Sequence, residues 1–234
     1  MTEQGLTIEG LVSGYGETDI LQGVSLALRR GEILALMGRN GMGKTTLLKT
    51  LMGLIRARGG TVSLDGRQVT GRPPSWLLAQ GVGYAPQELP LFQDLSIRDN
   101  LRLALRHDRD LPRALDHVGR SFPFLLDRLG QKAGTLSGGE QKMLILSRAL
   151  MCEPDLLLID EISEGVQPSV VQRITAALQA ERERRGISVL VVEQNLGFAL
   201  EVADRWAVMK LGRIVDAGPC DAASRETVLD HLSI

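Results

Sequence analysis

Three observations predict an α/β fold for this chain. Short apolar runs alternate with longer amphipathic runs, which is typical of layered α/β proteins. The apolar run 33–37 continues into a glycine-rich turn and then into a helical pattern. Between residues 96 and 151 the alternation stops, and helical patterns follow one another without a strand. We therefore expect a strand-and-helix core that is interrupted by an inserted helical segment.

The strands predicted between residues 33 and 85 are apolar runs bounded by glycine- or proline-rich turns. Ile33–Met37 is predicted to be a buried strand, and Lys44–Met52 the helix after the glycine-rich turn. Thr61–Leu64 and Val82–Ala85 are predicted strands, because Gly- or Pro-rich turns such as Gly71–Pro74 bound them.

The middle and last parts differ in their periodicity. Helices are predicted for Ser96–Arg106, Pro112–Leu129 and Gly138–Met151. The alternation then returns, with predicted strands at Leu156–Asp160, Ser188–Val192 and Trp206–Lys210, and predicted helices at Pro168–Arg184, Asn195–Ala203 and Asp221–Leu232, the last capped by Asp221.

Composition excludes some classes of function. The 27 basic and 28 acidic residues give a net charge of −1, so nothing favours nucleic acid as a partner. Cys152 and Cys220 lack the spacing of a metal site or a disulfide scaffold, which indicates a reducing compartment. The first residues do not resemble a secretory signal, and no apolar run approaches the length of about 20 residues that crosses a bilayer. We expect any membrane role to come through a partner.

One segment has the pattern of a phosphate-binding loop. Its glycines let the backbone N–H groups turn toward a triphosphate, and the helix that follows directs its positive end at the same charge. A lysine at this place reaches the β- and γ-phosphates, and the next hydroxyl can bind Mg²⁺. An accidental glycine-rich turn is the alternative, but the strand before and the helix after favour a nucleotide site. The residues are Gly38, Arg39, Asn40, Gly41, Met42, Gly43, Lys44 and Thr45, followed by Thr46.

Two carboxylates end a second apolar strand. Leu156–Ile159 leads directly into Asp160 and Glu161, at the strand end where α/β sheets place their ligands. We expect Asp160 to bind Mg²⁺ and Glu161 to polarise the attacking water. A polar turn after a strand is the alternative when this pattern stands alone.

A third pattern narrows the family. Leu136-Ser137-Gly138-Gly139-Glu140-Gln141 resembles the signature sequence of ATP-binding cassette (ABC) proteins. A serine before two glycines at a helix start can bind an anion, although the same residues would also serve as an ordinary helix cap. The resemblance implies that this element, from Ser137 to Glu140, contacts the γ-phosphate held by a second subunit.

The same resemblance extends to two single residues. Gln87, after the strand that ends at Ala85, is similar to the Q-loop glutamine, which implies contact with Mg²⁺ and the γ-phosphate and coupling to a membrane partner. Tyr15 is similar to the aromatic residue that stacks on adenine. The alternatives are a polar turn residue for Gln87 and a tyrosine packed in a sheet for Tyr15.

The chain departs from the general ABC pattern at three positions. Ile162 replaces the usual proline, Gln167 replaces the D-loop aspartate, and Gln194 stands where a switch histidine is usual. Gln194 can donate a hydrogen bond to the γ-phosphate but carries no charge, and we group it with Lys44 and Glu161 as a catalytic candidate. The three histidines, which lie outside every motif and are expected at the surface, are His107, His117 and His231.

These departures resemble one branch of the family. Val192-Glu193-Gln194-Asn195, together with Ala133–Gln141, is similar to the ATPase subunits of branched-chain amino acid importers, and Glu164–Ser169 is similar to those of the urea and short-chain amide branch. The resemblance implies an ATP- and Mg²⁺-dependent subunit peripheral to the cytoplasmic face of the inner membrane. It also implies a second ATPase subunit, two permease subunits and an external solute-binding protein, with no role for nucleic acid.

The resemblance also implies a division of the single domain. We expect a phosphate-loop NTPase core at 1–87 and 152–234, which includes an N-terminal antiparallel β subdomain, and a helical signature subdomain at 88–151. A soluble ABC ATPase, such as an iron–sulfur assembly ATPase, remains the alternative function. A module that binds nucleotide without hydrolysis is disfavoured, because Lys44, Asp160 and Glu161 are all present.

Overall fold

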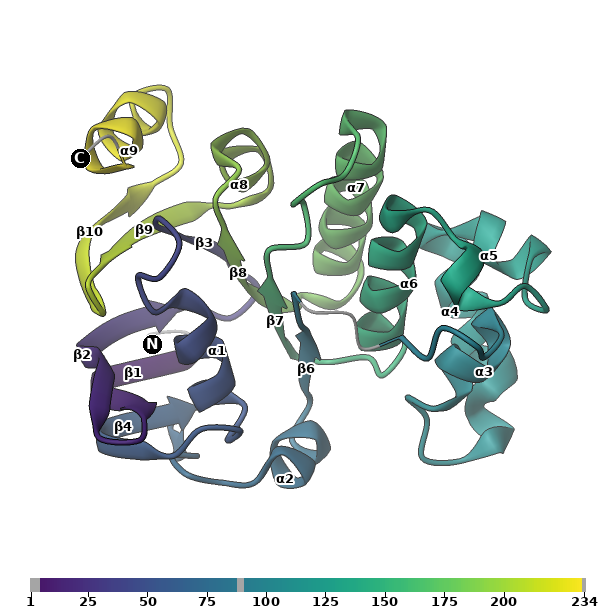
Figure 1. Cartoon of the computed structure of the whole chain (residues 1–234), viewed down its shortest axis with the longest axis horizontal. Helices are drawn as coiled ribbons and strands as arrows, with labels where there is room; N and C mark the ends of the chain where they lie inside the picture. Colours follow the sequence, from purple (N-terminus) through teal and green to yellow (C-terminus); the bar gives the residue numbers. More distant parts are fainter. Residues whose placement is uncertain (1–4, 88–90, 233–234) are drawn as a thin grey trace.

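The computed structural model describes residues 5–87 and 91–232, which form two β-sheets and a group of helices (Figure 1). The smaller sheet is antiparallel, with strand order β2-β1-β4-β5. Its strands are β1 (Leu6–Tyr15), β2 (Thr18–Leu28), β4 (Ala57–Leu64) and β5 (Arg67–Gln68). This is the antiparallel β subdomain that the resemblance implied.

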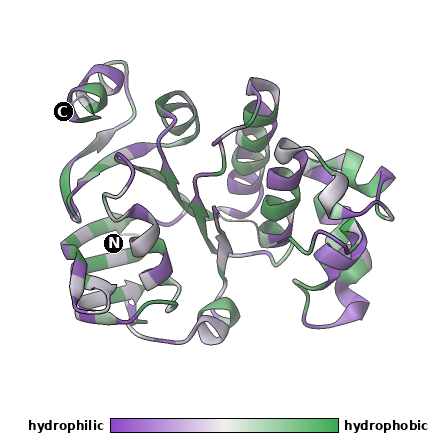
Figure 2. Ribbon diagram, viewed as in Figure 1, coloured by the Kyte–Doolittle hydropathy of each residue, from purple (hydrophilic) through white to green (hydrophobic). Residues whose placement is uncertain are grey.

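The larger sheet has six strands in the order β10-β9-β3-β8-β7-β6, and all pairs are parallel except β9 with β10. The strands are β3 (Ile33–Met37), β6 (Val82–Ala85), β7 (Leu156–Asp160), β8 (Ser188–Glu193), β9 (Arg205–Lys210) and β10 (Arg213–Pro219). Every residue of β3, β7 and β8 is buried, because helices or the smaller sheet cover both faces. In Figure 2, β7 and β8 are coloured largely as hydrophobic.

The two faces of the larger sheet belong to different hydrophobic cores. Successive side chains of a strand point to opposite faces. Ile33, Ala35 and Met37 accordingly pack in the core that contains α6 (Gly138–Leu150), α7 (Pro168–Arg185) and α8 (Leu196–Val202). Leu34 and Leu36 pack in the core that contains α1 (Lys44–Leu51) and the smaller sheet. The helices α1 and α6 therefore lie on opposite faces of the larger sheet (Figure 1).

The chain between β6 and β7 is helical, as the lost alternation predicts. It contains α3 (Ile97–Arg102), α4 (Leu111–Ser121), α5 (Pro123–Asp127) and α6, and it forms the right-hand lobe in Figure 1. The continuous helix expected over Pro112–Leu129 is wrong. Phe122 precedes Pro123 and is pushed to φ −136° and ψ 67°, which breaks the helix in two. Residue 88, the expected start of this subdomain, lies outside the described residues.

One helix was not predicted, and two further expectations need correction. The unpredicted helix is α2 (Pro74–Ala79), which begins at the end of the Gly71–Pro74 turn, since Pro is favourable in the first turn of a helix. The last helix, α9 (Ser224–Leu232), begins three residues after Asp221, although the Asp221 carboxylate does accept the backbone N–H groups of Ala223 and Ser224. His117 is buried rather than at the surface, because its ring lies between α4 and α7 and contacts the Glu181 carboxylate at 2.7 Å.

The helices carry no sign of a transmembrane segment. Within residues 5–87 and 91–232, none combines the length and the apolar character that crossing a bilayer requires.

Candidate nucleotide site

Four strands of the larger sheet end side by side. Register pairs Met37 of β3 with Glu193 of β8, and Asp160 of β7 with Val192 of β8. Ala85, the last residue of β6, pairs with Ile159 of β7. The loops that follow these strands therefore share one edge, which is where open α/β sheets bind ligands. Most of the nucleotide-site residues predicted from the sequence lie in or next to these four loops.

The phosphate loop connects β3 to α1 and is wrapped around a lysine. The Lys44 Nζ donates to the carbonyl oxygens of Gly38 at 2.8 Å and Arg39 at 3.1 Å, and the side chain is buried. Gly43 has φ 103°, and a Cβ atom at Gly38 would lie 2.5 Å from the Met209 carbonyl oxygen. Only glycine fits either position without strain or a clash.

Other residues of the loop fix it or face outward. Met42 accepts the Gly212 N–H at 3.0 Å through its carbonyl oxygen, which anchors the loop to the turn between β9 and β10. Thr46 is buried within the first turn of α1. The exposed residues are Arg39, Asn40 and Gly41. Because the first N–H groups of a helix have no partner within it, the start of α1 can bind an anion.

Asp160 lies beside the phosphate loop, and one of its two carboxylate oxygens has no hydrogen-bond partner among the described residues. Thr45 Oγ1 donates to Asp160 Oδ1 at 3.2 Å, whereas Oδ2 is buried without a hydrogen-bond partner in the described part of the chain. Burial raises the pKa of Asp160 to about 6, against the lowering effect of the Thr45 hydrogen bond. An orphaned carboxylate oxygen next to a hydroxyl fits a hard divalent cation such as Mg²⁺.

A protein-only metal cage is absent from the described residues, which contain no metal-binding group of three or more His, Cys, Asp or Glu side chains. Magnesium usually takes few protein ligands and completes its shell with waters and substrate phosphates. The pair Thr45 and Asp160 therefore suits a cation that arrives with a nucleotide.

Glu161 is the centre of the site. Its carboxylate accepts Gln87 Nε2 at 2.8 Å and Gln194 Nε2 at 2.8 Å, and it lies 3.3 Å from Lys44 Nζ. Its backbone has φ 45°, in the left-handed region that non-glycine residues rarely adopt, and its N–H donates to the Val192 carbonyl oxygen at 2.9 Å. The structure thus brings together Lys44, Gln87, Glu161 and Gln194, four residues that the sequence singled out from separate segments.

Three further residues join this network and were missed by sequence reasoning. Lys142 on α6 donates to the backbone oxygens of Glu161 at 3.1 Å and Gln87 at 3.4 Å. Glu164 accepts Gln87 Nε2 at 3.0 Å, and Glu193 binds the loop after Glu161. Glu193 and Glu164 stand inside quoted patterns, so their position beside motif residues was the available signal. Nothing in the helical periodicity distinguishes Lys142.

Tyr15 ends β1, and its side chain is 52% exposed. The alternative of a tyrosine packed within the sheet is therefore wrong. An exposed ring at a strand end offers a face on which a base can stack.

The signature residues begin α6, with Ser137 as the residue that caps the helix. Ser137 caps the helix through a capping box, in which its Oγ accepts the Glu140 N–H and the Glu140 carboxylate accepts the Ser137 N–H at 2.9 Å. Arg128 also pairs with Glu140 at 2.7 Å. Ser137 and Gly138 remain exposed. These exposed groups start α6, whereas the phosphate loop starts α1 on the opposite face of the larger sheet.

Comparison with known proteins decides the family. A family model described as ABC transporter matches residues 21–164, more than half of the chain. The chain belongs to the ABC transporter ATP-binding family. It is 39% identical over 212 residues to the high-affinity branched-chain amino acid transport ATP-binding protein BraG of Pseudomonas aeruginosa, which covers 90% of this chain and 91% of that protein.

Two more comparisons agree with this assignment. The probable branched-chain amino acid transport ATP-binding protein LivF of Archaeoglobus fulgidus is 34% identical over 210 residues, 89% of each chain. A nucleotide-free ATP-binding cassette from an ABC transporter superposes with a TM-score of 0.88 at 25% identity, over 96% of this chain and 95% of that one. The expected α/β cassette fold is thereby confirmed.

Membership of the family establishes the coarse activity. The chain binds and hydrolyses ATP as a member of this transporter family. The cargo is not fixed by similarity alone, since the lipopolysaccharide export ATP-binding protein LptB of Haemophilus influenzae is also 33% identical over 220 residues, 91% of this chain and 90% of that protein.

Proposed function

We propose that this chain is the ATP-hydrolysing subunit of an importer for branched-chain amino acids, urea or short-chain amides, at the cytoplasmic face of the inner membrane. Similarity to BraG and LivF supports the importer class, and the Glu164–Ser169 stretch supports the urea and amide branch. The observation that carries the catalytic part is the convergence of Lys44, Gln87 and Gln194 on the Glu161 carboxylate.

Each polar group of the site has a proposed role. The backbone of residues 38–46 and Lys44 hold the phosphates, and Tyr15 stacks on the base. Thr45, Gln87 and Asp160 would hold Mg²⁺, which neutralises charge on the phosphates when bound. Glu161 polarises the attacking water, and Gln194 donates to the γ-phosphate.

Two contacts in the site would have to change when ATP binds. Lys44 donates to the carbonyl oxygens of its own loop, and Glu161 is occupied by two amide donors and a lysine. Phosphate oxygens are stronger partners for Lys44 than carbonyl oxygens are. We expect ATP to draw Lys44 and Gln194 toward the γ-phosphate, which leaves the Glu161 carboxylate free to accept a proton from water.

A second ATPase subunit, either a copy of this chain or a paralogue, completes the proposed site. We expect Ser137, Gly138 and Gly139 of that subunit to cover the γ-phosphate, because within one chain the signature and the phosphate loop start helices on opposite faces of the sheet. Glu140 supports this element through the capping box.

Replacement of Glu161 tests the catalytic assignment. We expect Glu161→Gln to keep ATP binding and to lower turnover by at least about a hundredfold, because an amide cannot accept the proton. The matched control is Glu201→Gln, which changes an exposed carboxylate on α8. Turnover close to wild type in Glu161→Gln would show that another group polarises the water.

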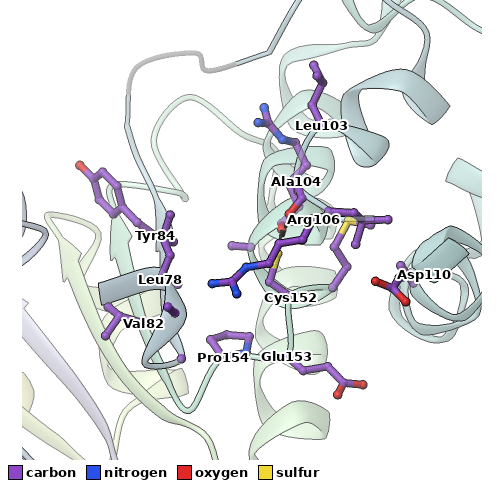
Figure 3. A pocket seen from close by; sticks show the side chains of 18 of the residues that line it. Leu78, Val82, Tyr84, Leu103, Ala104, Arg106, Asp110, Cys152, Glu153 and Pro154 are labelled. Atoms are coloured by element: carbon purple, nitrogen blue, oxygen red, sulfur yellow. Dashed lines mark hydrogen bonds between the residues drawn. The ribbon is translucent and has the colours of Figure 1, made fainter. Parts of the chain in front are cut away.

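A groove between the core and the helical lobe is the proposed permease contact. It has a volume of about 1160 Å³ and is lined by Leu78, Val82 and Tyr84 of the core and by Leu103 and Arg106 of the helical lobe (Figure 3). The side chains of Leu78 and Leu103 are 54% and 53% exposed. Apolar side chains exposed in one groove indicate a protein contact, and an apolar segment of a permease suits it.

A substitution in this groove distinguishes an importer subunit from a soluble ABC ATPase. We expect Leu103→Asp to release the chain from the membrane fraction while ATP binding is kept. Leu229→Asp is the matched control, because Leu229 is 43% exposed on α9 outside the groove. A wild-type chain that does not sediment with membranes in its native cells would favour the soluble alternative.

A further inference from the structure

Glu193 is a buried carboxylate next to the proposed switch residue. It ends β8, and its exposed fraction is 1%. No ion pair joins it to a basic side chain anywhere in residues 5–87 and 91–232. A buried carboxylate without a cation is costly unless hydrogen bonds compensate for lost hydration.

Hydrogen bonds from two loops supply that compensation. The Ser163 N–H donates to Glu193 Oε1 at 2.9 Å, and Ser163 Oγ donates to Oε2 at 2.8 Å. The Gln194 N–H donates to Oε2 at 3.3 Å. Burial raises the pKa of Glu193, and the Ser163 hydrogen bonds oppose that rise. The carboxylate therefore links the loop after β7 to the loop after β8.

Both linked loops contact Glu161. Ser163 lies two residues after it on the loop that leads to α7, while Gln194 donates Nε2 to Glu161 Oε1 at 2.8 Å and to Asn40 Oδ1 at 2.6 Å. The strained backbone at Glu161, with φ 45°, needs neighbours that hold it in place. Its N–H bond to the Val192 carbonyl oxygen supplies one support, and the Ser163–Glu193 contact supplies the next one along the chain.

We propose that Glu193 is a positioning residue that holds the loop 162–167 and Gln194 in register around Glu161. An amide or apolar side chain would fill the end of β8 without the cost of a buried charge, so packing alone does not account for a carboxylate there. A charged acceptor that binds both Ser163 donors and the Gln194 N–H fixes the two loops relative to each other. The inference rests on the proposed roles of Glu161 and Gln194.

The test compares Glu193→Gln with Ser163→Ala in the full chain with its partner subunits. An amide has one acceptor oxygen, and its NH₂ group would face the donors of Ser163 or Gln194. We expect Glu193→Gln to lower kcat about tenfold to a hundredfold, with KM for ATP changed less than about twofold. Ser163→Ala should lower kcat several-fold, and the double variant should be no slower than Glu193→Gln.

Controls separate positioning from stability. Glu32→Gln removes another buried carboxylate, which accepts the Arg29 N–H at 2.7 Å and lies before β3, and it should keep the wild-type kcat. If Glu193→Gln fails to fold, the kcat of Ser163→Ala alone tests the proposal, because that variant removes the hydrogen bond from Ser163 Oγ to Glu193 Oε2. Wild-type kcat in both Glu193→Gln and Ser163→Ala, or losses that multiply independently in the double variant, would overturn the proposal. Turnover that survives Glu161→Gln would instead refute the catalytic assignment on which it rests.

Discussion

The cluster of His117, Glu181 and Arg184, of which the first two are buried, should make the stability of this fold sensitive to acid. Glu181 on α7 is 3% exposed, and its carboxylate contacts His117 Nε2 on α4 at 2.7 Å and Arg184 at 2.6 Å. Burial alone would raise the pKa of Glu181, but the hydrogen bonds and charges of His117 and Arg184 outweigh it and lower the pKa to about 2. The cluster thus joins the helical lobe to the core through one ionised carboxylate.

The size of the effect follows from that pKa. A fall from the ordinary value of 4.5 to about 2 corresponds to roughly 3 kcal/mol of unfolding free energy. Because the folded-state pKa is the lower one, this contribution is complete above about pH 4.5 and is lost as the pH falls through about 2. At pH 3.5 the loss should be roughly 1.5 kcal/mol.

Urea denaturation of wild type and Glu181→Gln at pH 7 and pH 3.5 measures this difference. We expect the variant to be less stable by about 3 kcal/mol at pH 7 and by about half of that at pH 3.5. Glu183→Gln, an exposed carboxylate on the same helix, should change stability by less than about 0.5 kcal/mol at either pH. An equal penalty for Glu181→Gln at both pH values would refute the reasoning.

Two predictions concern the nucleotide site. Tyr15→Ala should weaken ATP binding about fivefold to a hundredfold, because stacking of a base on an aromatic ring is worth ~1–3 kcal/mol. Tyr15→Trp should keep the wild-type affinity, because tryptophan also offers a ring face. Equal affinities of the alanine and tryptophan variants in an ATP titration would exclude stacking. Gln194→His should add an acid limb near pH 6.5 to the pH profile of the ATPase rate, because histidine titrates there and glutamine does not. Identical profiles for the variant and the wild type would mean that residue 194 does not touch the reacting phosphate.

The parallel core could be predicted from sequence because its strands are continuous apolar runs bounded by glycine, proline or acidic residues. Ile33–Met37, Val82–Ala85 and Leu156–Asp160 match β3, β6 and β7. The break at Phe122 was missed, because helical periodicity continues across Pro123 while the backbone before a proline does not. Strand β10 escaped prediction because its residues are half exposed and lack a strong pattern.

The site residues were found where a pattern fixes their spacing. Lys44, Gln87, Glu161 and Gln194 each follow a recognisable strand end, and parallel pairing brings those ends together. The burial of His117 could not be foreseen, because its partners Glu181 and Arg184 lie more than sixty residues away and no local pattern links them. Lys142 was missed for the same reason, since only the fold brings α6 to the backbone of Glu161.

The central claim is that ATP bound to residues 38–45 is sealed by the signature of a second ATPase subunit. A structure of the assembled transporter with the Glu161→Gln substitution, ATP and Mg²⁺ tests it most directly. We expect Ser137 Oγ of the facing subunit, or its counterpart in a paralogue, within about 3 Å of a γ-phosphate oxygen. A nucleotide bound elsewhere, or signature N–H groups that face only solvent in the closed dimer, would contradict the account.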